Sequence, residues 1–422
     1  MNLIKTSVIK ESYLKPILKW ICIGTIIGIL SGCASALFLV SLEWVTSFRE
    51  AHGYIIWGLP VGGLLIGLLY HYQGKEVVKG NNQILETYYH SGPIIPLKMA
   101  PLIFIGTLIT HLFGGSAGRE GTAVQMSSAL SDQFSAVFKL NDSERRILII
   151  IGISAGFASV FGTPLAGALF AIEIVFVGKI NYKAILPAFF TAYIAHYTVL
   201  LLKVPHTHYS IHFIPEFSFT TLTYVVLSGV VFGFTALLFS KTTHFWGKLF
   251  SKFIHYPPIR PLIGGTIIAI SVCFIGTTKY IGLGIPTLVE AFNTPSESYA
   301  FLLKILFTSF TLGAGFKGGE VTPLFFIGAT LGSVLSLFIP LPLAFLTGIG
   351  FVAVFSGATH TPIACTVMGI ELFGLDGGLY LFIACFVAYL CSGNSGIYSA
   401  QIVNGPKSYL YQKWNTMHFK LF

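Results

Sequence analysis

The chain has 422 residues, of which 54% are hydrophobic and only 10% are charged, and its mean hydropathy is +0.79. Soluble domains carry about 25% charged residues, so this composition excludes a soluble globular enzyme, a disordered chain and a nucleic-acid-binding module. The formal net charge of +9 points to the anionic cytoplasmic leaflet of a membrane as the partner, and not to nucleic acid.

Apolar segments follow one another along nearly the whole chain. The expected membrane segments are residues 17–46, 54–72, 99–113, 145–160, 164–178, 184–202, 221–245, 260–277, 300–314, 322–338, 341–357, 362–374 and 377–392. Several are too short to cross about 30 Å of hydrocarbon as a helix that rises about 1.5 Å per residue. Their ends must therefore lie inside protein or water. The sequence predicts an all-α membrane protein, a polytopic helical bundle with broken, half-spanning helices.

Basic residues mark both ends of the sequence. The lysines that flank the apolar segments are Lys5, Lys10, Lys15 and Lys19 at the start and Lys407, Lys413 and Lys420 at the end. The first apolar segment is too long for a cleavable signal peptide. We expect a multi-pass protein of the plasma (inner) membrane with both termini cytoplasmic.

Two pairs of matched motifs indicate an internal repeat. The block GSAGREGT at 115–122 aligns with GFKGGEVT at 315–322, and TPLAGALFAIE at 163–173 aligns with TPIACTVMGIE at 361–371. The offsets, 200 and 198 residues, are nearly equal, which is unlike a chance match. We expect a first membrane repeat at 1–205, a loop at 206–218, and a second repeat with a C-terminal helix at 219–422. Two cytoplasmic termini and two equal halves favour inverted-topology repeats, in which substrates bind between broken helices.

Two matched glutamates are the main candidates for chemistry. Glu120 follows a Gly-rich break and begins a helical pattern, where backbone N–H groups and the helix dipole favour a carboxylate or an anion. Glu320 is its repeat counterpart, with Pro323 in the first helical turn behind it. Intramembrane carboxylates are costly and usually functional, so we expect both to couple protons to anions. Ordinary helix capping is the alternative for each, and a second alternative for Glu320 is that it holds a pore-lining hydrogen-bond network.

Other motifs give weaker signals. Gly80, Asn81 and Asn82 open a short helical segment, for which N-capping is the alternative interpretation. Tyr398 lies in a polar run that begins the last expected helix, and its hydroxyl can face an anion. A tyrosine of the membrane interface is the alternative interpretation. We interpret the matched Glu173 and Glu371 as structural carboxylates that hold backbone N–H groups.

The remaining reactive side chains are expected to be structural. His111, His196 and His360 have no metal-ligand spacing and are interpreted as satisfied core histidines. The six cysteines form no CxxC pair and are interpreted as buried, inert thiols. No metal and no cofactor is expected.

These blocks resemble the CLC chloride channel and transporter family along nearly the whole chain. The residues at 118–121 are similar to its gating-glutamate motif, those at 319–323 stand where its GxFxP motif is found, those at 80–84 where its GSGIP motif is found, and Tyr398 matches its pore tyrosine. The resemblance implies an antiparallel two-half helical fold and a homodimer with one pore per subunit.

Departures from the common CLC pattern resemble the fluoride-exporting bacterial CLC-F branch. Thr122 replaces a proline, Asn81 replaces the serine that contacts chloride, and Glu320 and Val321 replace Ile and Phe. Ile174 stands where chloride/proton exchangers carry a relay glutamate. The resemblance implies fluoride/proton antiport, in which Glu120 gates and carries the proton. The implied sites are Glu120 and Glu320 for proton coupling, and Gly80, Asn81, Asn82, Gly118, Gly121, Thr122, Gly319, Val321, Thr322 and Tyr398 for the anion.

Arg119 and Lys317 occupy matching repeat positions beside this pocket and are expected to add positive potential. Two other functions stay open. One is a passive chloride or mixed-anion channel of the same fold, gated by Glu120. The other is an intramembrane serine protease, since the GNSG run at 393–396 matches a GxSG nucleophile pattern and His360 is a possible base.

Overall fold

The computed structural model describes residues 2–90, 92–403 and 407, and of residues 2–15 it describes the backbone only. This part of the chain is helical, with isolated bridges and no extended strand. Its α-helices are α1 (Asn2–Ala51), α2 (Leu59–Tyr72), α3 (Asn81–Tyr89), α4 (Met99–Leu112), α5 (Glu120–Val137), α6 (Asp142–Phe161), α7 (Pro164–Val175), α8 (Tyr182–Leu201), α9 (Phe219–Phe253), α10 (Ile259–Ile275), α11 (Ile285–Glu290), α12 (Ala300–Gly313), α13 (Val321–Leu335), α14 (Leu343–Thr359), α15 (Pro362–Phe373) and α16 (Gly378–Cys391). Short 3₁₀ helices lie at Gly53–Gly58 and Lys75–Val77.

The helices have the lengths that the apolar segments predict for a multi-pass membrane protein. In the described part, four stretches are long and apolar enough to cross a membrane: Pro16–Ala51, Gly53–Tyr72, Tyr182–Leu201 and Phe219–Phe253. Other apolar helices, including α4, α7, α13 and α15, have 10–17 residues and are too short to span alone. The prediction of broken, half-spanning helices is confirmed.

Helices α1–α8 and α9–α16 pack in the same order. α5 packs on α6 as α13 packs on α14, α1 packs on α8 as α9 packs on α16, and α6 packs on α8 as α14 packs on α16. The two sets meet through equivalent helices, α2 with α10, α7 with α15 and α5 with α13. Gly63 lies against Pro261 and Gly67 against Pro258, so α2 and α10 are antiparallel.

Aromatic rings and glycines hold α13 in the core. Phe325 of α13 stacks on Phe351 of α14 with ring centroids 4.2 Å apart, and it also contacts Phe161 of α6 at 4.9 Å. A Cβ on Gly328 would stand 2.0 Å from the carbonyl oxygen of Gly350, so only glycine permits this approach of α13 to α14. The N-terminus of α13 is thereby fixed in the centre of the bundle.

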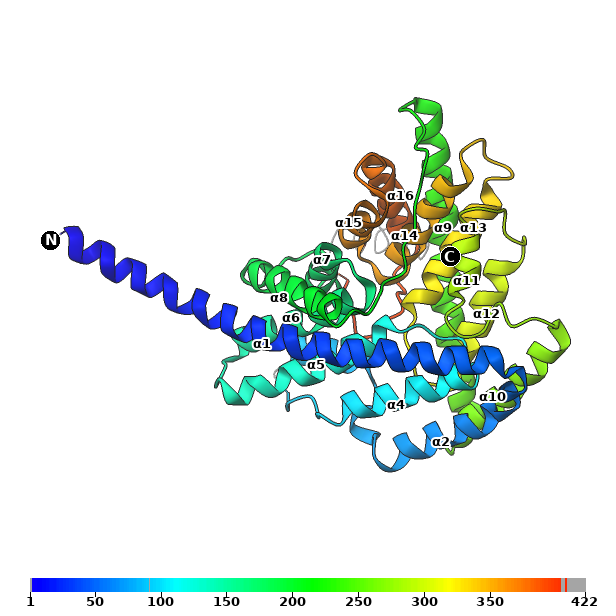
Figure 1. Ribbon diagram of the computed structural model, residues 1–422, viewed down its shortest axis with the longest axis horizontal. Coiled ribbons are helices and arrows are strands. Elements are labelled where there is room, and N and C mark those ends of the chain that lie inside the picture. Colours follow the sequence, from blue (N-terminus) through cyan, green and yellow to red (C-terminus); the bar gives the residue numbers. More distant parts are fainter. Residues whose placement is uncertain (1, 91, 404–406, 408–422) are drawn as a thin grey trace, which may run out of the picture.

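Some expected boundaries differ from the structure. α1 begins well before residue 17 and its N-terminal part extends beyond the bundle (Figure 1), because hydropathy marks the membrane segment and not the helix. α11 was not expected. The expected helix after Tyr398, with Lys413 and Lys420, lies outside the described residues.

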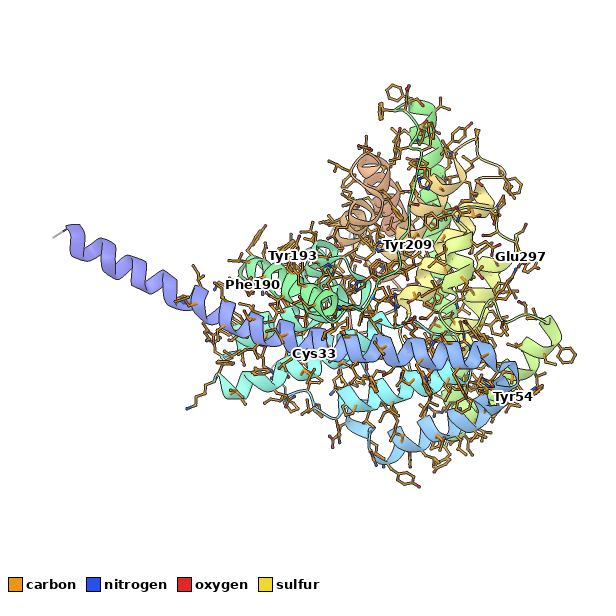
Figure 2. The ribbon with its side chains drawn as sticks, viewed as in Figure 1. Cys33, Tyr54, Phe190, Tyr193, Tyr209 and Glu297 are labelled. Atoms are coloured by element: carbon orange, nitrogen blue, oxygen red, sulfur yellow. The ribbon has the colours of Figure 1, made fainter. Side chains whose placement is uncertain are left out.

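The segment between α8 and α9 carries no helix from 204 to 218, as expected of a loop, but it packs against the bundle. Tyr209, labelled in Figure 2, contacts Phe351 of α14 with centroids 5.1 Å apart and Phe292 at 5.7 Å. This loop therefore covers the helices beneath it.

The interpretation of every cysteine as buried is wrong in part. Cys365 and Cys385 are buried, but Cys22, Cys33 and Cys273 are exposed on the outer surface of apolar helices, as Figure 2 shows for Cys33 on α1. Apolarity of a membrane segment does not distinguish a core-facing side chain from a lipid-facing one.

Candidate functional site

Glu120, the first residue of α5, lies at the centre of the site with no exposed surface. Its Oε2 accepts hydrogen bonds from the backbone N–H of Thr322 at 3.1 Å and from the Thr322 hydroxyl at 2.7 Å. The Arg119 Nε lies 3.6 Å from Oε1. The carboxylate of one repeat motif therefore occupies the N-terminus of α13, which the other repeat motif opens.

Two glycines bring these motifs together. The backbone N–H groups of Gly118 and Gly319 each donate to the other's carbonyl oxygen, at 2.5 and 2.8 Å. Gly318 has a φ of +154°, and a Cβ there would stand 2.5 Å from that of Ala117. A side chain at Gly318 or at Gly319 would push the two backbones apart. The Gly-rich sequences thus set the starts of α5 and α13 side by side.

Polar atoms converge on Gly121. The position that a Cβ of this glycine would take lies 2.9 Å from Asn81 Nδ2 and 3.6 Å from Glu320 Oε2. Asn81 Oδ1 and Glu320 Oε2 are buried without a hydrogen-bond partner among the described residues. Buried polar atoms are rarely left unpaired unless they meet an ion, a water or a reacting group. Two unpaired polar atoms thus lie beside the start of α5, where Glu120 stands.

The capping interpretations are wrong for two of these residues. The Glu320 side chain makes no capping hydrogen bond to α13. Asn81 is the first residue of α3 and not its N-cap, which is Gly80. Gly80 itself has a φ of +55°, and the Gln125 side chain lies 3.0 Å from where its Cβ would be.

A small cavity lies beside Asn81. It holds about 20 Å³ and is lined by Asn81, Ile84, Leu85, Val124, Ile153, Phe170, Ile174 and Tyr398. This volume is about that of one water molecule, and Asn81 and Tyr398 are the polar residues of its lining. Ile174 lines this cavity. An apolar side chain therefore occupies the position at which chloride/proton exchangers carry a relay glutamate.

Tyr398 also lines a larger cavity of about 660 Å³. Lys241, His244 and Lys248, on one face of α9, line the same cavity, and His244 Nε2 donates to the carbonyl oxygen of Gly396 at 2.9 Å. The cavity therefore combines positive charge with access to Tyr398.

A third cavity, of about 240 Å³, is lined by Arg119 together with Glu43 of α1 and His206. His206 donates to the Ser159 carbonyl oxygen at 3.0 Å, and its burial lowers the pKa of the imidazole. Arg119 is the basic residue of this cavity that approaches Glu120. Asn81 and Tyr398 line the small cavity together, and Tyr398 lines the largest of the three as well.

Comparisons with known proteins agree with this geometry. The model of the voltage gated chloride channel family matches residues 62–393. The chain belongs to this family, the CLC family. A chloride/fluoride channel protein of Pseudomonas syringae pv. tomato is 48% identical over 397 residues, which cover 93% of this chain and 88% of that protein. The voltage-gated ClC-type chloride channel ClcB of Salmonella typhimurium is 26% identical and covers 88% of this chain and 95% of its own length.

Solved structures give the same family. A crystal structure of a CLC-type fluoride/proton antiporter superposes with a TM-score of 0.89 at 32% identity, covering 92% of this chain and 98% of that one. A slow cyanobacterial Cl⁻/H⁺ antiporter matches with a TM-score of 0.79 at 20% identity, covering 94% and 99%. The second likeness establishes the CLC fold alone.

Among the other expected anion ligands of this CLC protein, several side chains have structural partners. The Thr122 hydroxyl lies 2.8 Å from the Thr107 hydroxyl, and Asn82 Oδ1 accepts the N–H of Ala400 at 2.9 Å. Val321 is 1% exposed. Asn82 thus holds the segment that carries Tyr398, while Asn81 faces the site.

The expectation for Lys317 is wrong. Its Nζ lies 4.0 Å from the centre of the Tyr70 ring and lines a different cavity, whereas Arg119 does approach Glu120. Lys241, His244 and Lys248 belong to no motif, and the signal that marks them in the sequence is their spacing, which places three polar groups on one face of an apolar helix.

The interpretation of Glu173 and Glu371 is confirmed. Glu173 accepts the N–H groups of Ile363 and Ala364 at the start of α15 at 3.2 and 2.9 Å. Glu371 accepts those of Leu165 and Ala166 at the start of α7, at 2.9 and 2.7 Å.

The interpretation of His111 and His360 as core histidines agrees with their burial. The backbone of Gly118 lies beside the His111 ring, and the Gln401 side chain and the backbone of Gly393 lie beside the His360 ring. His360 and Ser395 line the same cavity without the hydrogen bond that a nucleophile and its base require. The protease interpretation gains no support from this geometry. The described residues contain no cluster of metal-ligating side chains.

Proposed function

We propose that this protein exports fluoride in exchange for protons across the plasma (inner) membrane. The observation that carries the proposal is the Glu120 carboxylate, which accepts both the backbone N–H and the hydroxyl of Thr322. Donors at a helix N-terminus that bind a carboxylate also bind a small anion. The likeness to a CLC-type fluoride/proton antiporter at 32% identity supports the same function.

Exchange follows from competition for one set of donors. Ionised Glu120 fills the N-terminus of α13 and excludes the anion. Once protonated, its carboxyl loses the charge that holds it against Thr322 and Arg119, and fluoride takes its place. The proton leaves with the swing of Glu120 toward the cavity that Arg119 lines. Fluoride therefore enters only while Glu120 carries the proton, and ionised Glu120 and fluoride exclude each other from the same donors.

Glu320 is the second proton-coupling residue in this proposal. Its buried, unpaired Oε2 and the Asn81 Nδ2 both lie near the position that a Cβ of Gly121 would take, at 3.6 and 2.9 Å, and Gly121 directly follows Glu120. A protonated Glu320 donates to fluoride and an ionised one repels it. Glu320 thus supplies a proton-dependent contact beside Asn81.

The remaining anion ligands are Gly80, Asn81, Asn82, Gly118, Gly121, Thr122, Gly319, Val321, Thr322 and Tyr398. In this proposal Asn81, Thr322 and Tyr398 supply side-chain donors, and the glycines permit close approach of the backbone. Asn82, Thr122 and Val321 act by shaping the site. Fluoride is close in size to a water molecule, and the cavity between Asn81 and Tyr398 suits one such particle.

The proposed organisation is two inverted repeats, 1–205 and 219–422, with both termini cytoplasmic and two subunits per assembly. The antiparallel meeting of α2 with α10 and the reciprocal caps of Glu173 and Glu371 support a two-fold relation between the halves. The ligands of the protein are then fluoride, protons and lipid, with no cofactor, and the protein is not an enzyme.

The test is reconstitution in liposomes with simultaneous recording of fluoride, chloride and proton fluxes. A fluoride gradient should drive protons uphill in the opposite direction. Fluoride flux without proton movement would indicate instead the passive anion channel that the same fold permits.

A further inference from the structure

A basic cavity lies outside the proposed transport path, between α2 and α10. It holds about 390 Å³ and its lining includes His71, Lys75, Arg260 and Lys317. No Asp or Glu is present among the described residues that line it. A concentration of basic groups without acid is costly unless an anion joins it, because like charges repel across low-dielectric walls.

The basic groups of this cavity lack the partners that nearby lysines have. Lys79 pairs with Glu86 at 2.7 Å and Lys98 pairs with Glu76 at 2.8 Å. Lys75, Arg260 and Lys317 have no ion pair among the described residues.

Two of these cations are held in place. The Lys317 Nζ lies over the Tyr70 ring, 4.0 Å from its centre, and its Cβ and Cγ lie 3.0 Å from where a Gly106 Cβ would be. The Arg260 Nε donates to the carbonyl oxygen of Ile254 at 2.8 Å, which fixes the guanidinium and leaves its terminal nitrogens available. Preorganised Arg and Lys donors of this kind match the oxygens of a phosphate group.

The position of the cavity is that of a lipid headgroup. α2 ends and the antiparallel α10 begins here, so the cavity lies at the end of a helix pair and not halfway along it. Tyr72 and Tyr256 beside it are 72% and 42% exposed, as interfacial tyrosines are. With the N-terminus cytoplasmic, α1 crosses outward and α2 returns, so the cavity meets the leaflet that carries anionic lipid.

We propose that this cavity is a phosphate-binding site, which takes the headgroup of an anionic phospholipid or a free phosphate through Lys75, Arg260 and Lys317. The site is independent of fluoride transport, since it shares no residue with the proposed path. Its test therefore measures binding and not flux.

The experiment follows the melting temperature of the purified full-length protein in detergent. Dioctanoyl phosphatidylglycerol, dioctanoyl phosphatidylcholine and inorganic phosphate are titrated separately. We expect phosphatidylglycerol to raise the melting temperature and phosphatidylcholine to have little effect. Lys75→Gln and Lys317→Gln should each weaken the apparent affinity about fivefold, the effect of removing one basic residue from an anionic surface.

Lys79→Gln is the matched control, because it removes the same charge from a nearby position outside the cavity. The affinity of this variant for phosphatidylglycerol should equal that of the wild type. Lys75 is exposed, so its variant should fold even if that of Lys317 does not. A response to inorganic phosphate with the same variant pattern would identify free phosphate as the ligand. The proposal would be overturned if neither phosphatidylglycerol nor inorganic phosphate raised the melting temperature. Equal affinities in Lys75→Gln and the wild type would also overturn it.

Discussion

The Thr322 hydroxyl lies 2.7 Å from one carboxylate oxygen of Glu120 and 2.9 Å from the other. These residues lie 202 positions apart and belong to the two matched motifs of the repeat. In the proposed mechanism the Glu120 carboxylate and fluoride compete for the hydrogen-bond donors of Thr322. The relation between these two residues therefore predicts how coupling fails when either one is changed.

Glu120→Gln should abolish proton coupling. The amide cannot bind and release a proton at this site, and it carries no charge to compete for the N-terminus of α13. Fluoride should move passively down its gradient, without uphill proton movement, in liposomes that carry a pH electrode and a fluoride electrode. Glu290→Gln, an exposed carboxylate outside the cavities of the site, serves as control and should stay coupled. Uphill proton transport by Glu120→Gln would exclude this carboxylate as the carrier.

Thr322→Val should slow fluoride exchange while leaving the fold intact. Valine has nearly the same shape but lacks the hydroxyl, and a hydrogen bond to a charged group contributes about 1.5–3 kcal/mol. We expect a loss of roughly tenfold to a hundredfold in turnover, with recovery in Thr322→Ser.

The control for this prediction is Thr330→Val in the same helix, whose hydroxyl bonds only to carbonyl oxygens of α13. Its turnover should be that of the wild type. Equal losses in both variants would mean that the valine acts through helix packing and not through the carboxylate.

Repeat equivalence predicted where the motifs lie better than it predicted what their side chains do. The match of Glu173 with Glu371 predicted that both carboxylates hold backbone N–H groups. Each one does cap a helix of the other repeat. Arg119 and Lys317 are matched in the same way, yet one approaches Glu120 and the other turns to Tyr70.

The reason is physical. A backbone cap depends on local geometry that both repeats share, whereas the direction of a long side chain depends on which neighbours the unlike residues around it provide. Tyr70 offers Lys317 an aromatic face, and Glu120 offers Arg119 a carboxylate. For the same reason no pattern in the sequence foretold that Thr107 pairs with Thr122.

Glu320→Ala and Glu371→Ala should fail in different ways. Glu371 accepts two backbone N–H groups, so its loss leaves α7 uncapped and should lower the melting temperature, at about 1–3 kcal/mol for buried groups left unpaired. Glu320 Oε2 has no partner among the described residues, so its loss should spare stability and impair turnover or the proton-to-fluoride ratio. Melting curves and flux recordings on both variants separate the effects. Equally mild flux defects in the two would remove Glu320 from the coupling mechanism.

Lys241→Gln and Lys248→Gln should raise the fluoride KM at low salt with little change in maximal rate. Both lysines line the cavity that leads to Tyr398, where their field concentrates anions without touching the site. The effect should fade as ionic strength approaches 1 M, where the screening length falls to about 3 Å. Lys252→Gln, on α9 but outside the cavity lining, should match the wild type at every salt concentration. A KM change that persists at high salt would indicate direct contact with the anion instead of steering.

Asn81→Ser should relax the preference for fluoride over chloride. The Asn81 amide reaches to 2.9 Å from the Cβ position of Gly121, so it fills space between α3 and α5 and brings a donor to a cavity that suits one water-sized particle. Serine is shorter, which widens the cavity for chloride and withdraws the donor that replaces part of the hydration shell of fluoride.

A hundredfold preference corresponds to about 2.7 kcal/mol, within the range of one or two such hydrogen bonds, so the single change should lower the fluoride-to-chloride flux ratio by about tenfold. Val321→Phe, combined with Asn81→Ser, should lower it further if the site then takes the chloride-type pattern. Paired fluoride and chloride efflux from the same liposomes measures the ratio, and an unchanged ratio in Asn81→Ser would place selectivity at Thr322 or Tyr398 instead.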